Sequence, residues 1–197
     1  MSAPAATPDG EGTAAVLLAA GASRRFGAAD KLLAGLRGRP LVAHAAAALR
    51  QSGLAPLIAV TTNPQVAALL PEFRIVRPDL PDPAQSDSLR AGIAAARALG
   101  AARVVVALGD MPDVPPDLLR AVAARATDTL PAAATDGARV LPPACFPAAL
   151  FDALLVARGD RGARGLLAGL PEAQRVPAAP GALRDIDTPA DLAAPGG

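Results

Sequence analysis

Residues 14–31 read AAVLLAAGASRRFGAADK and join an apolar run to a glycine-containing loop. The run 14–19 predicts a buried strand, and the loop after it ends at Lys31, the only lysine in the chain. Gly21 and Gly27 can adopt backbone conformations closed to other residues, so main-chain N–H groups can converge on an anion. The loop also offers side-chain donors and positive charge, from Ser23, Arg24, Arg25 and Lys31. It is therefore a candidate cradle for a triphosphate.

The lone lysine has two interpretations. A compact ammonium on a flexible stem can enter a tight phosphate pocket that excludes a planar guanidinium, which would explain why arginine has not replaced it. Alternatively, Lys31 is a solvated loop residue in a chain that GC-rich coding has filled with arginine. The loop is neither of two common phosphate-binding motifs, because Gly27 is followed by Ala28 rather than lysine and G-x-G-x-x-G is absent.

Short apolar runs alternate with alanine-rich segments on both sides of this loop. We expect strands at 14–19, 57–61, 74–77 and 103–108, and helices at 40–52, 64–70, 86–99 and 115–126. This alternation predicts an α/β fold, a single-domain Rossmann-like three-layer sandwich with a mostly parallel central sheet. The run VVVAL from Val104 lacks polar alternation and should form a central strand. Because ligands bind beyond the carboxyl ends of such strands, the loops after 19 and after 108 should meet at one crevice.

Composition limits the remaining possibilities. Of the 197 residues, 52% are hydrophobic and 19% charged, which suffices for one core, and we expect a disordered leader at 1–12 and one domain at 13–194. A net charge of +1 and 2% aromatic residues argue against a nucleic acid polymer as partner. No apolar run approaches the ~18 residues of a membrane span. The single cysteine excludes an internal disulfide and the start lacks signal-peptide features, so we expect the cytoplasm.

Asp110 directly follows the most apolar strand, in the string LGDMP at 108–112. A carboxylate there suits Mg²⁺, which proteins bind through one or two acidic groups plus substrate phosphates. The structural alternative is a turn-forming aspartate before proline. The candidate phosphate loop at the same edge of the sheet favours the metal site. Asp113, three residues further on, stands in position to cap the helix expected from 115.

A second group of carboxylates lies in DIDTPADL at 185–192. Period-two alternation places Asp185 and Asp187 on the same face of a short extended segment, and Thr188 with the following proline begins a final helix. The alternative is capping of that helix by Asp187 or Thr188, with Asp191 adding favourable charge in its first turn. Spacing alone does not separate these two interpretations.

Other catalytic chemistries lack the residues they need. His44, the single histidine, lies in the alanine-rich helical segment, where a packed or surface imidazole is commoner than a catalytic one, so a Ser-His-Asp triad has no support. Cys145 has no second cysteine and no local histidine, which argues against a zinc site or a Cys-His dyad. We expect it in the core.

Five strings, in the same order, resemble motifs of the MobA-like NTP transferase family, and particularly of its molybdenum cofactor cytidylyltransferases. Residues 18–31 resemble the signature L-x-G-G/A-x-S-x-R-M-G followed by lysine, with Phe26 in place of methionine. SDSLRAG at 86–92 resembles the motif beside the base and ribose, and it opens a helix with Ser86 at its cap. LGDMP resembles the metal-site motif. GDRGAR at 159–164 resembles an acceptor-side string of the cytidylyl branch, and DIDTPADL resembles the carboxyl-terminal motif.

The resemblance implies a nucleotide-diphospho-sugar transferase-like fold that moves CMP from CTP to the terminal phosphate of molybdopterin and releases pyrophosphate. The implied catalytic residues are Lys31, Arg25 and Asp110, and the implied ligands of Mg²⁺ or Mn²⁺ are Asp110 and Asp187. Nucleotide contacts are implied for Leu18, Ala19, Ala20, Gly21, Ser23, Arg24, Arg25, Lys31, Ser86, Ser88, Leu89, Gly92 and Asp110. Acceptor contacts are implied for Asp185, Arg164 and Asp160.

Three alternatives stay open. The spacing from Gly27 to Lys31 is closer to the guanylyl branch, so GTP could replace CTP. The segment 138–146 lacks a glycine and a histidine found in relatives, which leaves another phosphorylated small molecule as a possible acceptor. A different class of function is a nucleotide-binding accessory module that docks a cofactor onto a molybdoenzyme or its chaperone, which predicts nucleotide binding without pyrophosphate release.

Overall fold

Seven strands form one sheet in the computed structural model, which describes residues 12–21, 26, 30–80, 83–156 and 162–193. Their order across the sheet is β5-β4-β1-β6-β8-β7-β9, and among these strands only β8 runs antiparallel to its neighbours. The strands are β1 (Thr13–Leu18), β4 (Leu57–Val60), β5 (Arg74–Val76), β6 (Arg103–Leu108), β7 (Ala132–Thr135), β8 (Val140–Pro147) and β9 (Arg175–Pro177).

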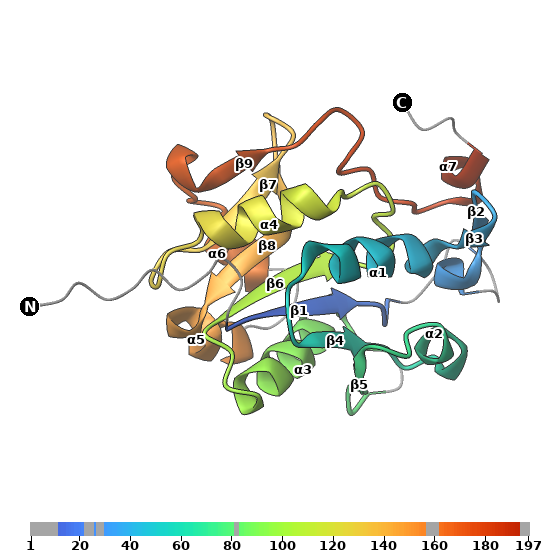
Figure 1. Ribbon diagram of the computed structural model, residues 1–197, viewed down its shortest axis with the longest axis horizontal. Coiled ribbons are helices and arrows are strands. Elements are labelled where there is room, and N and C mark those ends of the chain that lie inside the picture. Colours follow the sequence, from blue (N-terminus) through green and yellow to red (C-terminus); the bar gives the residue numbers. More distant parts are fainter. Residues whose placement is uncertain (1–11, 22–25, 27–29, 81–82, 157–161, 194–197) are drawn as a thin grey trace, which may run out of the picture.

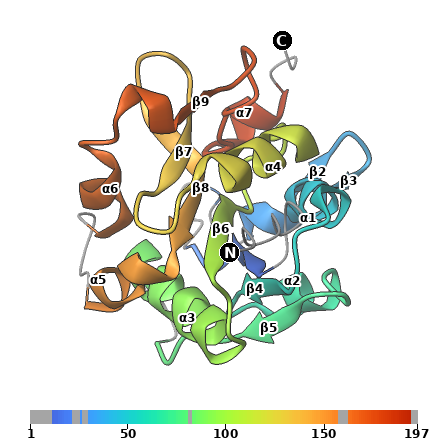
Figure 2. The same cartoon turned by 60° about the vertical axis from the view of Figure 1, so that its left-hand side comes forward.

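Helices cover both faces of this sheet (Figure 1). On one face α1 (Leu41–Ser52) and α4 (Pro116–Arg125) lie side by side, and α2 (Pro64–Ala68) packs into the same core. On the other face lie α3 (Gln85–Ala98), α5 (Phe151–Val156) and α6 (Gly162–Leu167), as Figure 2 shows. The three layers match the expected α/β sandwich. None of the described helices is both long enough and apolar enough to cross a membrane.

Several short elements lie near the end of β1. A 3-10 helix, η2 (Lys31–Leu33), leads into a hairpin of β2 (Gly35–Leu36) and β3 (Arg39–Pro40), and α7 (Pro189–Ala193) is the last element that the structure describes. Figure 1 shows the hairpin and α7 close to each other, beyond the tip of the β1 arrow. Among the described residues, the 3-10 turns η3 (Ala148–Leu150) and η5 (Glu172–Gln174) connect elements elsewhere.

Alternate residues of the central strands supply the two cores. In β1 and β6, Leu17 and Val105 face the core beneath α1 and α4, while Val16 and Val104 face the core beneath α3. Gly92 of α3 lies directly against this sheet, because a Cβ placed on it would be 2.5 Å from Val16 Cγ1. The missing side chain therefore lets α3 pack close to the sheet.

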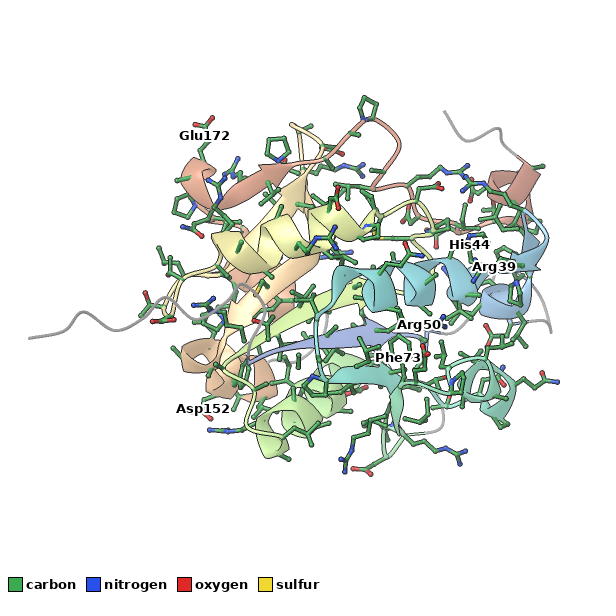
Figure 3. The ribbon with its side chains drawn as sticks, viewed as in Figure 1. Arg39, His44, Arg50, Phe73, Asp152 and Glu172 are labelled. Atoms are coloured by element: carbon green, nitrogen blue, oxygen red, sulfur yellow. The ribbon has the colours of Figure 1, made fainter. Side chains whose placement is uncertain are left out.

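A cation–π contact links the end of α1 to its neighbours. The guanidinium carbon of Arg50, in the last turn of α1, lies 5.9 Å from the centre of the Phe73 ring, a cation–π contact (Figure 3). Phe73 itself is buried in the core beneath α1. This contact ties α1 to the turn that leads into β5.

All eight elements expected from the sequence are present within a few residues of their predicted bounds, and β6 is the central strand as expected. Two predicted helix caps are wrong. The α3 helix begins at Gln85 with Ala84 as its N-cap, so Ser86 lies inside the helix, while the Asp87 carboxylate accepts the Ala84 N–H (2.9 Å). Asp113 does not cap α4: the N-cap of this helix is Pro115, and no side-chain hydrogen bond caps it. Two arginines bind the Asp113 carboxylate instead.

Candidate active site

The site forms where β1 and β6 end side by side. Leu18 and Leu108 are register partners at the carboxyl ends of these parallel strands, so the loops that follow them leave the sheet at one edge. The Gly109 N–H donates to Leu18 O (2.9 Å), and a Cβ on Gly109 would lie 3.3 Å from that same oxygen. Glycine at 109 thus lets the two loops approach closely and places Asp110 beside the β1 loop.

Lys31 is held at this edge by its neighbours. Asp30 caps η2, since its Oδ1 accepts the Leu32 N–H (2.9 Å). The other oxygen, Oδ2, accepts from Asn63 Nδ2 (2.8 Å) in the loop after β4. The backbone at Lys31 is therefore tied to a third strand of the sheet.

The Lys31 ammonium lies between two carboxylates from distant parts of the chain. Its Nζ is 2.7 Å from Asp110 Oδ2, 3.0 Å from Asp187 Oδ1 and 3.1 Å from the carbonyl oxygen of Ile186. Only 12% of the Lys31 side chain is exposed, against 22% for Asp110 and 46% for Asp187. Burial opposes the charged ammonium, but the charges and hydrogen bonds of the two aspartates outweigh it and raise the pKa of Lys31. Lys31 is therefore not a solvated loop residue.

The segment before α7 places Asp187 at the site. The Ile186 N–H donates to the Asp110 carbonyl (2.9 Å), which fixes this segment against the β6 loop. The helix start is held by Asp191, whose Oδ2 accepts from the Asp187 N–H (2.9 Å), the Thr188 N–H (2.6 Å) and the Thr188 hydroxyl (2.8 Å). The Thr188 hydroxyl hydrogen bond, followed by the two N–H groups, lowers the pKa of Asp191. Capping thus belongs to Asp191 and Thr188, and the Asp187 carboxylate faces Lys31.

Asp110 carries an oxygen suited to a metal ion. Its Oδ1 is buried and has no hydrogen-bond partner among the described residues, which is costly for a carboxylate unless a ligand satisfies it. No cluster of three or more His, Cys, Asp or Glu side chains able to hold a metal occurs in the described part of the chain. Asp110 and Asp187 offer two carboxylates, so a hard divalent cation held by them would take its remaining ligands from phosphate oxygens and water.

Two cavities border these residues. A cleft of about 110 Å³ is lined by the end of β1, Lys31, Ser88 and Asp110. A larger cavity of about 550 Å³, within the range of small-molecule sites, lies on the β8 and α6 side. The two share three lining residues, Leu18, Gln85 and Leu108. The walls of the larger cavity are mainly apolar, and the charged residues among its described lining are Arg139, Arg164, Arg175 and Asp185.

The sequence-predicted residues distribute over both cavities. The smaller cleft takes Leu18, Ala19, Ala20, Gly21, Lys31, Ser88 and Asp110. The larger takes Ser86, Leu89, Arg164 and Asp185. Gly92 and Asp187 line neither cavity; Gly92 packs against the sheet, and the Asp187 carboxylate contacts Lys31. Four predicted residues lie outside the described part of the chain: Ser23, Arg24, Arg25 and Asp160.

Some residues of the site were not predicted from the sequence. Gln85 lines both cavities and precedes the SDSLRAG string directly, but no local pattern distinguishes it from a solvated helix residue. Arg139 and Arg175 reach the larger cavity from the β7–β8 turn and from β9. His44 stays outside the site's chemistry, as expected: its Nε2 lies 2.8 Å from Leu36 O, and Figure 3 shows it beside Arg39 near the start of α1.

The model of one family, the MobA-like NTP transferase domain, matches residues 15–176. The chain belongs to this family. It is a nucleotidyltransferase. The family model covers most of β1 and all of η2 and β6, so it includes Lys31 and Asp110, while Asp187 lies beyond its end. Comparison with curated protein sequences found no match.

Solved structures agree with the family assignment. A nucleotidyl transferase from Methanothermobacter is 27% identical, with a TM-score of 0.78 over 92% of this chain and 94% of that one. Rv0371c from Mycobacterium tuberculosis is 28% identical, with a TM-score of 0.75 over 92% and 96%. Rv0371c has also been solved in complex with manganese (25% identity, TM-score 0.70, covering 92% and 96%). A 4-diphosphocytidyl-2C-methyl-D-erythritol synthase from Anaerococcus prevotii, 13% identical with a TM-score of 0.72 over 95% and 96%, shares the fold.

Proposed function

We propose that this nucleotidyltransferase moves CMP from CTP to the terminal phosphate of a molybdopterin-type acceptor and releases pyrophosphate. The observation that carries the proposal is the convergence of Lys31, Asp110 and Asp187 from three distant segments. Lys31 and Asp110 line the smaller cleft, which shares wall residues with the larger cavity. One cavity borders the phosphate loop, and the other has room for a second substrate. A transferase with two substrates needs such a pair of adjoining sites.

The chemistry needs no covalent enzyme intermediate. An oxygen of the acceptor phosphate forms a bond to the α-phosphorus of CTP, and the bond from that phosphorus to the bridging oxygen breaks, so pyrophosphate leaves. The attacking phosphate is already ionised at pH 7, so no histidine base is required. Lys31 supplies a compact positive charge for the phosphates as negative charge moves towards the leaving group.

Asp110 and Asp187 would hold Mg²⁺ or Mn²⁺, with the buried Asp110 Oδ1 as the strongest reason. Such a cation, when bound, neutralises phosphate charge. The chain's own lysine already shows that a positive charge is stable between these carboxylates. Lys31 must then turn from the aspartates to phosphate oxygens, which its flexible stem allows.

The larger cavity suits the acceptor. Its apolar walls fit a ring system, and Arg164 fits an anion, whereas Arg139 already pairs with Asp136 and Arg175 Nε donates to Leu170 O. The Arg164 side chain has no hydrogen-bond or ion-pair partner among the described residues, so its donors remain available to a ligand. The strings at 19–21, 86–92 and 159–164 support CTP as the donor nucleotide. Since nucleoside triphosphates are abundant in the cytoplasm, we place the enzyme there.

The test is pyrophosphate release from CTP, GTP, ATP and UTP with Mg²⁺ and molybdopterin. We expect release with CTP, and loss of release in Asp110→Asn and Lys31→Ala. The same pattern with GTP would assign the enzyme to guanylyl transfer. Nucleotide binding that depends on Lys31 but gives no release with molybdopterin would overturn the proposed acceptor, and a panel of other phosphorylated acceptors would then distinguish a different transferase from a docking module.

A further inference from the structure

Asp113 contacts both of the other segments that build the site. Its Oδ1 lies 2.6 Å from Arg37 Nη1, on the hairpin that follows Lys31. Its Oδ2 lies 3.3 Å from Arg184 Nη2, on the segment that carries Asp187. Asp113 itself follows Asp110 by three residues. One carboxylate thus joins the lysine segment, the β6 loop and the carboxyl-terminal segment.

The Arg184 link continues towards the site through side-chain contacts, and the Arg37 link runs through the backbone of the hairpin, which follows Ala34, whose N–H donates to Lys31 O (3.0 Å). Arg184 Nη1 donates to the carbonyl oxygen of Asp191 (3.2 Å), and the Asp191 carboxylate holds the N–H groups of Asp187 and Thr188. On the other side, Arg37 stands in the tight turn between β2 and β3 with a positive φ of 49°, a backbone conformation that residues other than glycine rarely adopt. The ion pair with Asp113 holds this turn over the β6 loop.

We propose that Asp113 is a positioning residue for nucleotidyl transfer, which aligns Lys31 and Asp187 on Asp110 through Arg37 and Arg184. The Asp113 carboxylate is 18% exposed and meets two guanidinium groups, a geometry in which ion pairs are screened less than at a fully solvated surface. This inference rests on the proposed function, because the aligned groups are those assigned to phosphates and metal. Asp113 lines neither of the two cavities, so it acts through its two partners.

The variants separate the two links. Asp113→Asn keeps the shape but removes the charge, Arg184→Gln breaks the link to Asp187, and Arg37→Gln breaks the link to the Lys31 segment. Asp117→Asn is the matched control, since Asp117 pairs with Arg120 within α4 on an 86% exposed side chain and joins no site segments. Asp113→Glu tests whether restoring the charge restores function.

The first readout is Mn²⁺ affinity in the presence of a non-hydrolysable CTP analogue. We expect about a tenfold loss in Asp113→Asn and in Arg184→Gln, as for groups that orient metal ligands, and about a twofold change or less in Asp117→Asn. The double variant Asp113→Asn with Arg184→Gln should lose no more than the worse single variant. Arg37→Gln should raise KM for CTP and leave Mn²⁺ affinity unchanged. Asp113→Glu should recover part of the lost affinity.

The second readout, amide hydrogen exchange, does not depend on activity. Asp113→Asn should speed exchange at residues 186–188 and at the hairpin 35–40, whereas Asp117→Asn should not. Unchanged exchange and unchanged Mn²⁺ affinity in Asp113→Asn would overturn the proposal. If the wild type itself neither binds Mn²⁺ nor releases pyrophosphate, the proposed function fails, and the exchange experiment alone decides whether Asp113 positions these segments.

Discussion

Lys31 and Asp110 are 79 residues apart in the chain, and their charged atoms lie 2.7 Å apart. The pair shows that the loop after β1 and the loop after β6 form one site, as parallel strands that end side by side require. Asp187, 156 residues from Lys31, completes the group. Each of these three side chains has a partner whose charge it needs, so removing one changes the electrostatics of the others.

Replacing Lys31 should separate catalysis from metal binding. In Lys31→Met the transfer rate should fall ~100-fold or more, because the phosphates lose a positive charge. Mn²⁺ affinity without nucleotide should rise, because the two carboxylates lose their internal counter-ion. Isothermal titration with Mn²⁺ measures the second effect. Lys31→Arg keeps the charge and serves as the control; equal Mn²⁺ affinity in the wild type and Lys31→Met would contradict this account of the site.

The two aspartates should not be equivalent. Asp110 is more buried and carries the unsatisfied Oδ1, so Asp110→Asn should abolish Mn²⁺ binding and lower transfer ~100-fold or more. Asp187→Asn should raise the Mn²⁺ concentration needed for half-maximal activity while retaining measurable turnover. Titration of activity with Mn²⁺ after removal of metal by EDTA makes the comparison, and a larger loss in Asp187→Asn would reverse the proposed order.

Arg164 should affect the acceptor and not the nucleotide. Arg164→Gln removes a positive charge from the larger cavity without breaking a contact within the described structure. We expect KM for the acceptor to rise about tenfold or more, the cost of a charged hydrogen bond, with KM for CTP nearly unchanged. The control is Arg97→Gln, because Arg97 lies on the outer face of α3 and pairs there with the exposed Asp152. A change confined to KM for CTP would place the nucleotide in this cavity instead.

Gly92 should be required for packing. Gly92→Ala puts a methyl group 2.5 Å from Val16 Cγ1, so α3 must move, at a cost of about 1–3 kcal/mol in the free energy of unfolding. Gly165→Ala in α6 is the matched control, because nothing lies within 4 Å of its added Cβ and alanine favours a helix by up to about 1 kcal/mol. Urea denaturation compares the two. A neutral Gly92→Ala would show that α3 has more room than the contacts indicate.

Cys145 should be unreactive in the folded protein. It is buried in β8, and burial raises the pKa of its thiol from 9.0 to about 12. A thiol reagent at pH 8 should therefore modify it only after unfolding. Because folding raises the pKa of the Cys145 thiol, the contribution of this thiol to the free energy of unfolding is complete below pH 9 and is lost as the pH rises towards 12. Tyrosine and lysine side chains also titrate in this range, but the chain has no tyrosine and only one lysine. In Cys145→Ala the free energy of unfolding should therefore fall clearly less steeply with pH in this range than in the wild type.

Local patterns predicted the first two thirds of the fold well. Apart from η2 and the hairpin of β2 and β3, which were not predicted, the elements up to α4 follow from apolar runs, proline at helix starts and strand-helix alternation, which depend on residues near one another in sequence. The strands β7, β8 and β9 were not predicted. The insertion of β8 antiparallel between β6 and β7 depends on pairs between β6 and β8 that are 38 or more residues apart in the chain, such as Val104 with Phe146, and no local signal encodes that choice.

The sequence by itself determined the α/β class, the loop ending in the lone lysine and the identity of the carboxylates that could serve beside it. The tertiary structure decided which of them do: it turned Asp187 towards Lys31, gave the capping role to Asp191, and made Asp113 a link between segments instead of a helix cap. The reason is physical. A carboxylate has similar local options at a cap, a turn or a metal site, and only the cations and N–H groups that folding brings beside it select among them.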